Sequence, residues 1–307
     1  MIANFFNKTK PVNIINVLML LFLFYVVSFF VEHTIEFSWG FLLNKTIYFF
    51  WLLLFILIFK FIIKKNKLTK DNAYALLIAV LILGTFPEVI FSNSVLFSNL
   101  ILLLSFRKIY SLKSGIHIKI KLFDAAFWIG ISTLINAWSV LFIFLIYVGI
   151  IVYQKISVKN LLIPIIGLTT PLCIYFTYHF YFATLPVFYN KFNFDISLNY
   201  LSYADFKHLL PIAFLILILT WSIVISTPKI ILVSNHLKFS WSVLINHLII
   251  STILIGLSTT KNSAEFFYLI FPASIIIGNF IQNIKSTILK NVILYLFLIL
   301  SVSIYFL

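Results

Sequence analysis

The chain has 307 residues, of which 63% are hydrophobic and only 10% are charged. About a quarter of the residues of a soluble domain are charged, so this composition excludes an ordinary water-soluble protein and predicts an integral membrane protein. The net charge of +14 would also suit a nucleic-acid-binding protein, but the basic residues lie in the connections between apolar segments. That placement predicts contact with anionic lipid headgroups and no nucleic-acid partner.

Apolar runs long enough to cross much or all of the roughly 30 Å hydrocarbon core of a bilayer recur along the whole chain. They predict an all-α polytopic helical bundle, one membrane domain over residues 1–307, with about eleven transmembrane segments. The number falls to about nine if two short hairpins, 73–86 with 94–106 and 122–135 with 138–153, do not reach the far surface. In chain order the runs are 13–31, 46–63, 73–86, 94–106, 122–135, 138–153, 161–181, 209–226, 241–257, 266–281 and 291–307.

The basic residues predict the orientation. If the N-terminus lies inside the cell, the outer connections hold only Lys45, Lys191, Lys207 and Lys261, and the rest of the 22 basic residues lie inside or can snorkel there. This asymmetry predicts an inner N-terminus and an outer C-terminus. The first apolar run has no small-residue cleavage site after "VVSFFVEH", so we expect it to be a retained anchor.

The inner loop 107–121, "RKIYSLKSGIHIKIK", is the more distinctive of the two longest connections. One interpretation is a basic loop that only fixes the topology, with Asp124 capping or pairing near the start of the next helix. The other is a docking surface for anionic lipid headgroups or for the cytoplasmic tail of a partner, because "IHIKIK" alternates apolar and basic residues as a segment lying on headgroups does. Its basic residues are Arg107, Lys108, Lys113, Lys119 and Lys121.

Residues that could act on a substrate gather in the outer connections, including the longest outer loop, 183–207. A carboxylate buried in hydrocarbon is costly, so one at a helix end either reaches water or lines a cavity. The plain interpretation is that these residues are solvated groups at helix ends. The functional interpretation assigns Glu36 and Glu88 to catalysis, and Trp39, Asn93, Lys191, Asp195 and Lys261 to substrate binding.

No cofactor is evident from the motifs. The sequence contains no Cys and His cluster with metal spacing and no glycine-rich phosphate motif. A divalent cation held by Glu36, Glu88 and Asp195 would still suit a phosphate-containing substrate.

The order of segments in residues 73–182 resembles a known architecture. A short hairpin with Pro87 leads to an inner basic turn after "LLLSFRK", a second hairpin "FWIGISTLINAWSVLFIFLIYVGIIVYQK" and the segment "KNLLIPIIGLTTPLCIYFTYHFYF". This order is similar to the core of GT-C-type integral-membrane glycosyltransferases, which take sugars from polyprenyl-phosphate donors on the outer face of the membrane. The resemblance implies an acidic residue in the first outer loop as general base or metal ligand. Glu36 occupies that loop, with Glu32 less well placed, although the loop has no aspartate and is shorter than is usual in the family.

The whole chain, chiefly in "RKIYSLKSG" and "KLFDAAFWIGI", also resembles an uncharacterised family of bacterial multi-pass inner-membrane proteins of the cell envelope. Three functions remain open. The first is a lipid-linked-sugar glycosyltransferase with a polyprenyl-phosphate lipid as partner. The second is a non-catalytic subunit or scaffold that assembles other membrane subunits for envelope assembly, secretion or motility. The third is a transporter or flippase, for which Pro164, Gly167 and Pro171 break one helix but no internal repeat supplies a counterpart.

Overall fold

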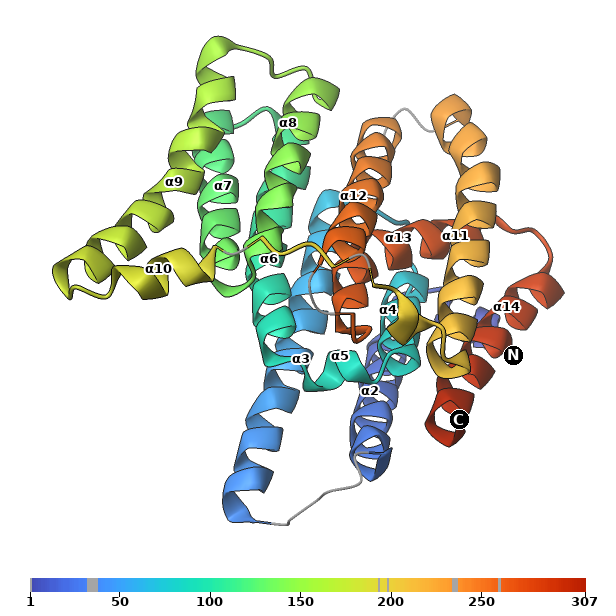
Figure 1. The fold of residues 1–307 in the computed structure, drawn as a ribbon. Coiled ribbons are helices and arrows are strands. Elements are labelled where there is room, and N and C mark those ends of the chain that lie inside the picture. The colour runs from blue at the N-terminus through green and yellow to red at the C-terminus, as the bar shows by residue number, and fades with distance from the viewer. Residues whose placement is uncertain (1, 32–37, 193, 198, 234–236, 259–260) are drawn as a thin grey trace. The chain divides into compact units, whose positions relative to one another are not determined.

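The computed structural model describes residues 2–31, 38–192, 194–197, 199–233, 237–258 and 261–307. Within these ranges every regular element is an α-helix or a 3-10 helix, and no strand occurs (Figure 1). The predicted all-α class is therefore confirmed.

The chain divides into two compact units. Unit 1 consists of Met1–Asn93, Asn199–Ser234 and Lys261–Leu307, and unit 2 of Ser94–Leu198 and Asn235–Thr260. The helices of unit 1 are α1 (Ile2–Phe6), α2 (Pro11–Val31), α3 (Trp39–Asn66), α4 (Tyr74–Thr85), α5 (Glu88–Phe91), η3 (Leu201–Tyr203), α11 (Phe206–Val233), η4 (Ala264–Phe266), α13 (Phe267–Asn283), α14 (Thr287–Ser303) and η5 (Ile304–Phe306). Those of unit 2 are α6 (Asn93–Ser111), η1 (Leu112–Ser114), α7 (Ile118–Ile135), η2 (Ala137–Phe142), α8 (Ile143–Val152), α9 (Val158–Tyr181), α10 (Leu185–Lys191) and α12 (Lys238–Leu257).

Among the described residues, 8 helical segments are long and apolar enough to cross a membrane, so the chain is a multi-pass helical membrane protein. All the predicted apolar runs lie on helices, but the predicted number of about eleven spans is not confirmed. The 12-residue α4 extends only about 18 Å, and the segment Ala137–Val152 is also short. The 8 segments are Pro11–Phe29, Trp39–Asn66, Asn93–Ser114, Val158–Tyr181, Phe206–Leu232, Lys238–Leu257, Ala264–Asn283 and Thr287–Phe306.

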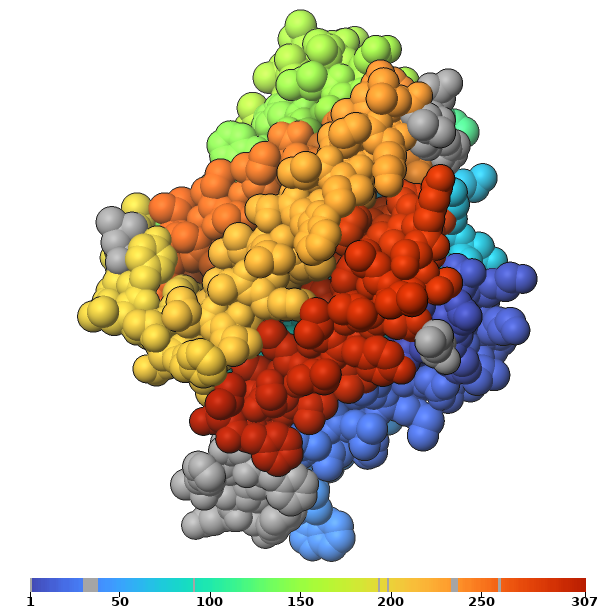
Figure 2. Space-filling view, turned by 90° about the vertical axis from the view of Figure 1, so that its right-hand side faces the viewer, coloured from blue at the N-terminus to red at the C-terminus, as the bar shows by residue number. Residues whose placement is uncertain are grey.

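Two helices, α4 and α13, form the core of unit 1. Every residue of α4 is buried, and a Cβ added to Gly278 of α13 would lie 3.0 Å from Ala75 of α4. The helices α2 and α14 pack against α4, and α11 packs against α13. The helix α4 is therefore surrounded by protein and not by lipid. For this reason it can lie within the bundle although it is too short to span a bilayer. The helix α14 lies at the surface of this unit (Figure 2) and exposes aliphatic side chains such as Ile288 and Ile299.

The helix ends of unit 1 fall into two groups that differ in charge. At one end the side chain of Asn291 accepts a hydrogen bond from the Ala3 backbone N–H at 3.0 Å, and the Tyr74 hydroxyl donates to the Ala3 carbonyl at 2.7 Å. We call this the basic end, because the chain around it carries Lys8, Lys10, Lys64, Lys65, Lys67, Lys70, Lys285 and Lys290. The opposite helix ends carry Glu88, Asp205 and Glu265, with Lys45, Lys207 and Lys261, and we call them the carboxylate end.

In unit 2, α7 and the N-terminal part of α9 pack against each other (Figure 1). A Cβ on Gly130 of α7 would lie 2.4 Å from Pro171 of α9, and a Cβ on Gly167 of α9 would lie 2.6 Å from the carbonyl oxygen of Phe123. Small residues permit this close approach of two helices in a membrane. Because the contacts advance along both helices together, the helices run parallel and begin at the same end of unit 2.

Several buried polar side chains of unit 2 form hydrogen bonds with side chains on neighbouring helices. The hydroxyl of Ser98 on α6 lies 2.8 Å from that of Ser132 on α7 and 2.7 Å from that of Ser139 on η2. The hydroxyl of Tyr110 on α6 lies 3.1 Å from Nδ1 of the buried His247 on α12. These hydrogen bonds satisfy groups that would be costly to bury alone.

Candidate functional site

The carboxylate end of unit 1 brings together two acidic residues that are far apart in the sequence. Pro87, with a φ of −60°, precedes the short helix α5, whose first residue is Glu88. The helix α5 packs against η4, which contains Glu265. The rings of Phe86 and Phe266 stack with centroids 4.6 Å apart and fix this contact. Glu88 and Glu265 therefore lie on neighbouring short helices.

Glu265 is buried, with 2% of its surface exposed. The hydroxyl of Tyr203 on η3 donates a hydrogen bond to its Oε1. Its Oε2 has no hydrogen-bond partner among the described residues. A carboxylate is costly to remove from water without full hydrogen bonding, and a buried ionisable residue in a membrane protein is by default a candidate for function.

Tyr203 is suited to remain a hydrogen-bond donor. Burial, together with the hydrogen bond to Glu265 and its charge, raises the pKa of the Tyr203 hydroxyl. The hydroxyl therefore keeps its proton at neutral pH. The ring of Tyr203 also contacts that of Phe266, with centroids 5.8 Å apart, which holds η3 against η4.

Glu88 differs from Glu265 in being only partly buried. Its Oε2 is enclosed by protein and, in the part of the chain that the structure describes, makes no hydrogen bond. The Tyr48 hydroxyl donates to the Val89 carbonyl at 3.3 Å and ties α5 to α3. The hydroxyl of Tyr305 is close enough to Glu88 to interact electrostatically. Glu88 is thus held in place with one oxygen left to bind a ligand or accept a proton.

Polar groups from two further segments complete the cluster. The ammonium of Lys261 lies 4.9 Å from the centre of the Tyr200 ring. Burial lowers the pKa of Lys261, and the charge of Glu265 opposes this shift. The hydroxyl of Ser263 lies 3.0 Å from Nδ1 of His208. Lys261 and the hydrogen-bonded pair of Ser263 and His208 therefore belong to the segments that surround Glu265.

The structure brings together only part of the predicted site. Glu88 and Lys261 both lie in the cluster around Glu265. Glu36 lies outside the described residues. The other predicted substrate-binding residues are exposed: Trp39 at the start of α3 and Asn93 at the start of α6, with Lys191 and Asp195 in unit 2.

Sequence reasoning did not assign a role to Glu265 or Tyr203. The signal for Glu265 was present in "SAEFF", where the carboxylate stands at the start of an apolar helix and not in the loop before it. The pairing with Tyr203 joins residues 62 positions apart, and no pattern in the sequence reveals it.

The predicted divalent cation stays a prediction. Over the described residues, no group of three or more His, Cys, Asp or Glu side chains could hold a metal ion. Of the three proposed ligands, Glu88 lies in unit 1 and Asp195 in unit 2, and the position of Glu36 is not described.

The predicted basic loop spans the end of α6, η1 and the start of α7. The ammonium of Lys108 lies 2.5 Å from the carboxylate of Asp124, so the predicted pairing of Asp124 is confirmed. Lys121 donates to the Ser111 carbonyl and to the Ser114 hydroxyl, both at 2.7 Å. Two of the basic residues therefore stabilise the loop itself. The others are Arg107 on α6, Lys113 on η1 and the exposed Lys119 on α7.

Comparison of the chain with protein-family models, with curated proteins and with solved structures gives no match. The resemblance to GT-C-type glycosyltransferases and to a bacterial membrane-protein family therefore stays a prediction. The functional inference rests on the residues of the carboxylate end.

Proposed function

We propose that the chain is a bacterial inner-membrane enzyme that transfers a sugar from a polyprenyl-phosphate donor to an acceptor at the outer surface. The observation that carries the proposal is the pair Glu88 and Glu265, each with a buried oxygen that lacks a hydrogen-bond partner within the described ranges. Carboxylates placed in this way are available for acid–base chemistry or for binding a ligand.

The charge distribution supports an outward-facing site. In both units the clusters of basic residues gather at one set of helix ends, and basic residues accumulate on the cytoplasmic side of bacterial membrane proteins. The basic end of unit 1 is then cytoplasmic, and the carboxylate end faces outwards. A donor whose sugar is carried on a lipid phosphate would present that sugar at this surface.

Glu88 is the better candidate for the general base, because part of its side chain is open and Glu265 is already bonded to Tyr203. In the proposed reaction the acceptor hydroxyl gives its proton to Glu88, and its oxygen forms a bond to C1 of the sugar. The bond between C1 and the phosphate oxygen breaks, and its electron pair leaves with the polyprenyl phosphate. Lys261 would offset the charge of the phosphate.

The proposal is tested in a deletion strain complemented with the wild type, Glu88→Gln, Glu265→Gln or Asp205→Asn. Asp205 is an exposed carboxylate at the same end and serves as the matched control. Lipid-linked saccharides and surface glycans are profiled by mass spectrometry, and the amount of each variant in the membrane is measured. We expect the deletion and the Glu88→Gln strain to accumulate an unused lipid-linked sugar and the Asp205→Asn strain to match the wild type.

Two results would contradict the proposal. If the deletion strain had the same glycans and lipid-linked saccharides as the wild type, the proposed transferase function would be ruled out. A deletion phenotype that Glu88→Gln and Glu265→Gln both fully rescue would show that neither carboxylate acts in a reaction. The non-catalytic scaffold would then be the better explanation of the deletion phenotype.

A further inference from the structure

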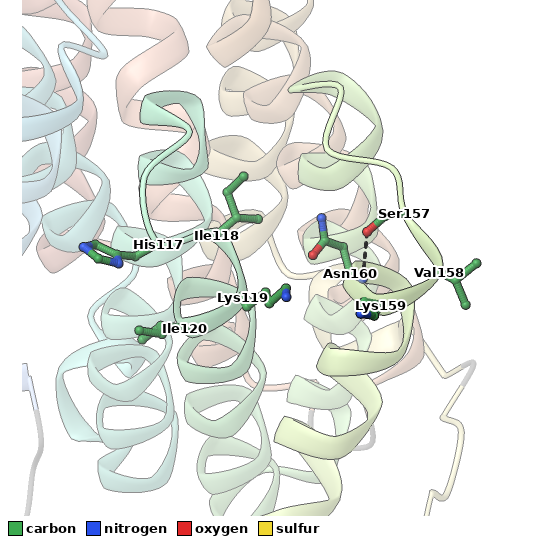
Figure 3. Close-up of a pocket in the computed structure, with 8 residues that line it drawn as sticks. All are labelled: His117, Ile118, Lys119, Ile120, Ser157, Val158, Lys159 and Asn160. Atoms are coloured by element: carbon green, nitrogen blue, oxygen red, sulfur yellow. Dashed lines mark hydrogen bonds between the residues drawn. The ribbon is translucent and has the colours of Figure 1, made fainter.

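A groove of about 720 Å³ opens between the first turns of α7 and α9 in unit 2 (Figure 3). Residues 117–120 line one side and residues 157–160 the other. The two helices start at the same end because they run parallel and pack closely at Gly130 and Gly167. The proposed carboxylate site lies in unit 1, so this groove is independent of it.

The groove has a basic rim. Lys119 on α7 and Lys159 on α9 are both exposed, and neither of the lining stretches, "HIKI" and "SVKN", contains an acidic residue. The nearby carboxylate of Asp124 is already paired with Lys108. Lys119 and Lys159 therefore present positive charge with no acidic side chain between them in the lining.

The helix starts add to this positive field. The partial positive charge of each helix dipole lies at its N-terminus. At the start of α9 the Ser157 hydroxyl accepts a hydrogen bond from the Asn160 N–H at 3.2 Å. At the start of α7 the N-cap residue is His117, with a φ of 50°, and in the described structure its side chain makes no capping hydrogen bond. The first N–H groups of α7 are thus not satisfied by a side-chain cap.

The groove also has apolar lining residues, and it continues into a surface suited to lipid. Ile120 and Val158 are 58% and 75% exposed. Along α9 the aliphatic surface goes on through Leu162, Ile165 and Ile166, which are all exposed. The helix α9 is long and apolar enough to cross a membrane, and most of its residues are not buried within the protein. A basic rim above a long aliphatic surface matches a molecule with an anionic head and an acyl chain.

We propose that this groove binds an anionic phospholipid, with the headgroup phosphate at Lys119 and Lys159 and an acyl chain along α9. The site takes in the α9 stretch 157–160, which lies outside the predicted basic loop. A soluble acidic peptide would match the charge of the rim but would leave the aliphatic surface of α9 uncovered.

The test uses the full chain purified in detergent and titrated with phosphatidylglycerol or phosphatidylcholine, with bound lipid counted by native mass spectrometry. We expect tighter binding of phosphatidylglycerol. The double variant Lys119→Gln, Lys159→Gln should lose this binding by roughly tenfold or more. The matched double variant Lys64→Gln, Lys65→Gln removes the same charge from the basic end of unit 1 and should bind as the wild type does.

A second variant tests whether binding needs the open groove as well as the positive charge at its rim. Ile118→Trp fills the groove and keeps every lysine, so it should also weaken phosphatidylglycerol binding while the protein keeps its unfolding temperature. The proposal would be overturned if the wild type bound phosphatidylcholine as tightly as phosphatidylglycerol. It would also be overturned if the Lys64 and Lys65 double variant lost as much phosphatidylglycerol binding as the Lys119 and Lys159 double variant, or if Ile118→Trp bound phosphatidylglycerol as the wild type does. Displacement of the lipid by inorganic phosphate at the same concentration would indicate a soluble-anion site and overturn it as well.

Discussion

The Tyr203 hydroxyl donates a hydrogen bond to Oε1 of Glu265 and thereby joins η3 to η4 at the carboxylate end of unit 1. Glu265 is almost fully buried, and its second oxygen makes no hydrogen bond within the described part of the protein. This bond therefore offsets part of the cost of burying the carboxylate. The effect of this hydrogen bond on the free energy of unfolding can be measured without knowing the substrate.

We expect Tyr203→Phe to destabilise the protein by about 1–3 kcal/mol, because the substitution removes a hydrogen-bond donor from a buried carboxylate. Glu265→Gln removes the charge, so Tyr203→Phe should cost less in that background. The free energy of unfolding in detergent, measured for both single variants and the double variant, gives the coupling between the two side chains.

The control for this cycle is Tyr181→Phe, which removes a hydroxyl from a side chain that is 81% exposed. It should change the free energy of unfolding by less than about 0.5 kcal/mol. A Tyr203→Phe effect no larger than that of the control would show that the hydrogen bond does not stabilise the fold.

The contact between α7 and α9 gives a second prediction. At Gly167 an added Cβ would lie 2.6 Å from the Phe123 carbonyl oxygen and 2.9 Å from the Cβ of Ala126. Backbone atoms cannot move aside easily, so Gly167→Ala should force the helices apart and cost about 1–3 kcal/mol. The thermal unfolding midpoint in detergent reports the loss.

Gly40 provides the matched control, since it lies in α3 and a Cβ there would meet nothing within 4 Å. Gly40→Ala should stabilise the protein by up to about 1 kcal/mol, because alanine favours a helix over glycine. If Gly167→Ala and Gly40→Ala both raised the thermal unfolding midpoint, this result would contradict the close contact of α7 with α9.

Much of the fold could be predicted from the sequence, because each apolar run was long enough to specify a helix by itself. The runs 73–86 and 122–135, for example, lie on α4 and α7. Their role as spans could not be predicted, because a run of 12–14 residues does not reveal whether lipid or protein covers it. The burial of every residue of α4 depends on α2, α13 and α14, which are distant in sequence.

The candidate site could be predicted only in part. Glu88 and Lys261 stood out because charged residues are rare in this chain and both flank apolar runs. The contact of α5 with η4, and of Tyr203 with Glu265, depends on tertiary packing that residue patterns do not encode. By sequence alone Glu265 does not differ from the other acidic residues at helix ends, and only the tertiary packing places it in the protein interior.

The N-terminal helix α1 gives a third prediction. Its Ala3 N–H donates to Asn291 on α14, and its Ala3 carbonyl accepts from Tyr74 on α4. Asn291→Leu keeps the size of the side chain but removes the acceptor, leaving a buried N–H without a partner at a cost of about 1–3 kcal/mol. Hydrogen exchange should increase at residues 2–6. Slow exchange at Ala3 in this variant would contradict the role of Asn291.

The orientation of unit 1 can be tested by cysteine labelling. The single native cysteine, Cys173, is exposed on α9, so the experiment uses a Cys173→Ala background. Asp205→Cys places a thiol at the carboxylate end and Lys70→Cys places one at the basic end, both at exposed positions. Because basic residues accumulate on the cytoplasmic side, a membrane-impermeant maleimide should label Asp205→Cys in intact cells and Lys70→Cys only after permeabilisation. The reverse pattern would place the two carboxylates in the cytoplasm, where they could not meet a donor sugar presented at the outer surface.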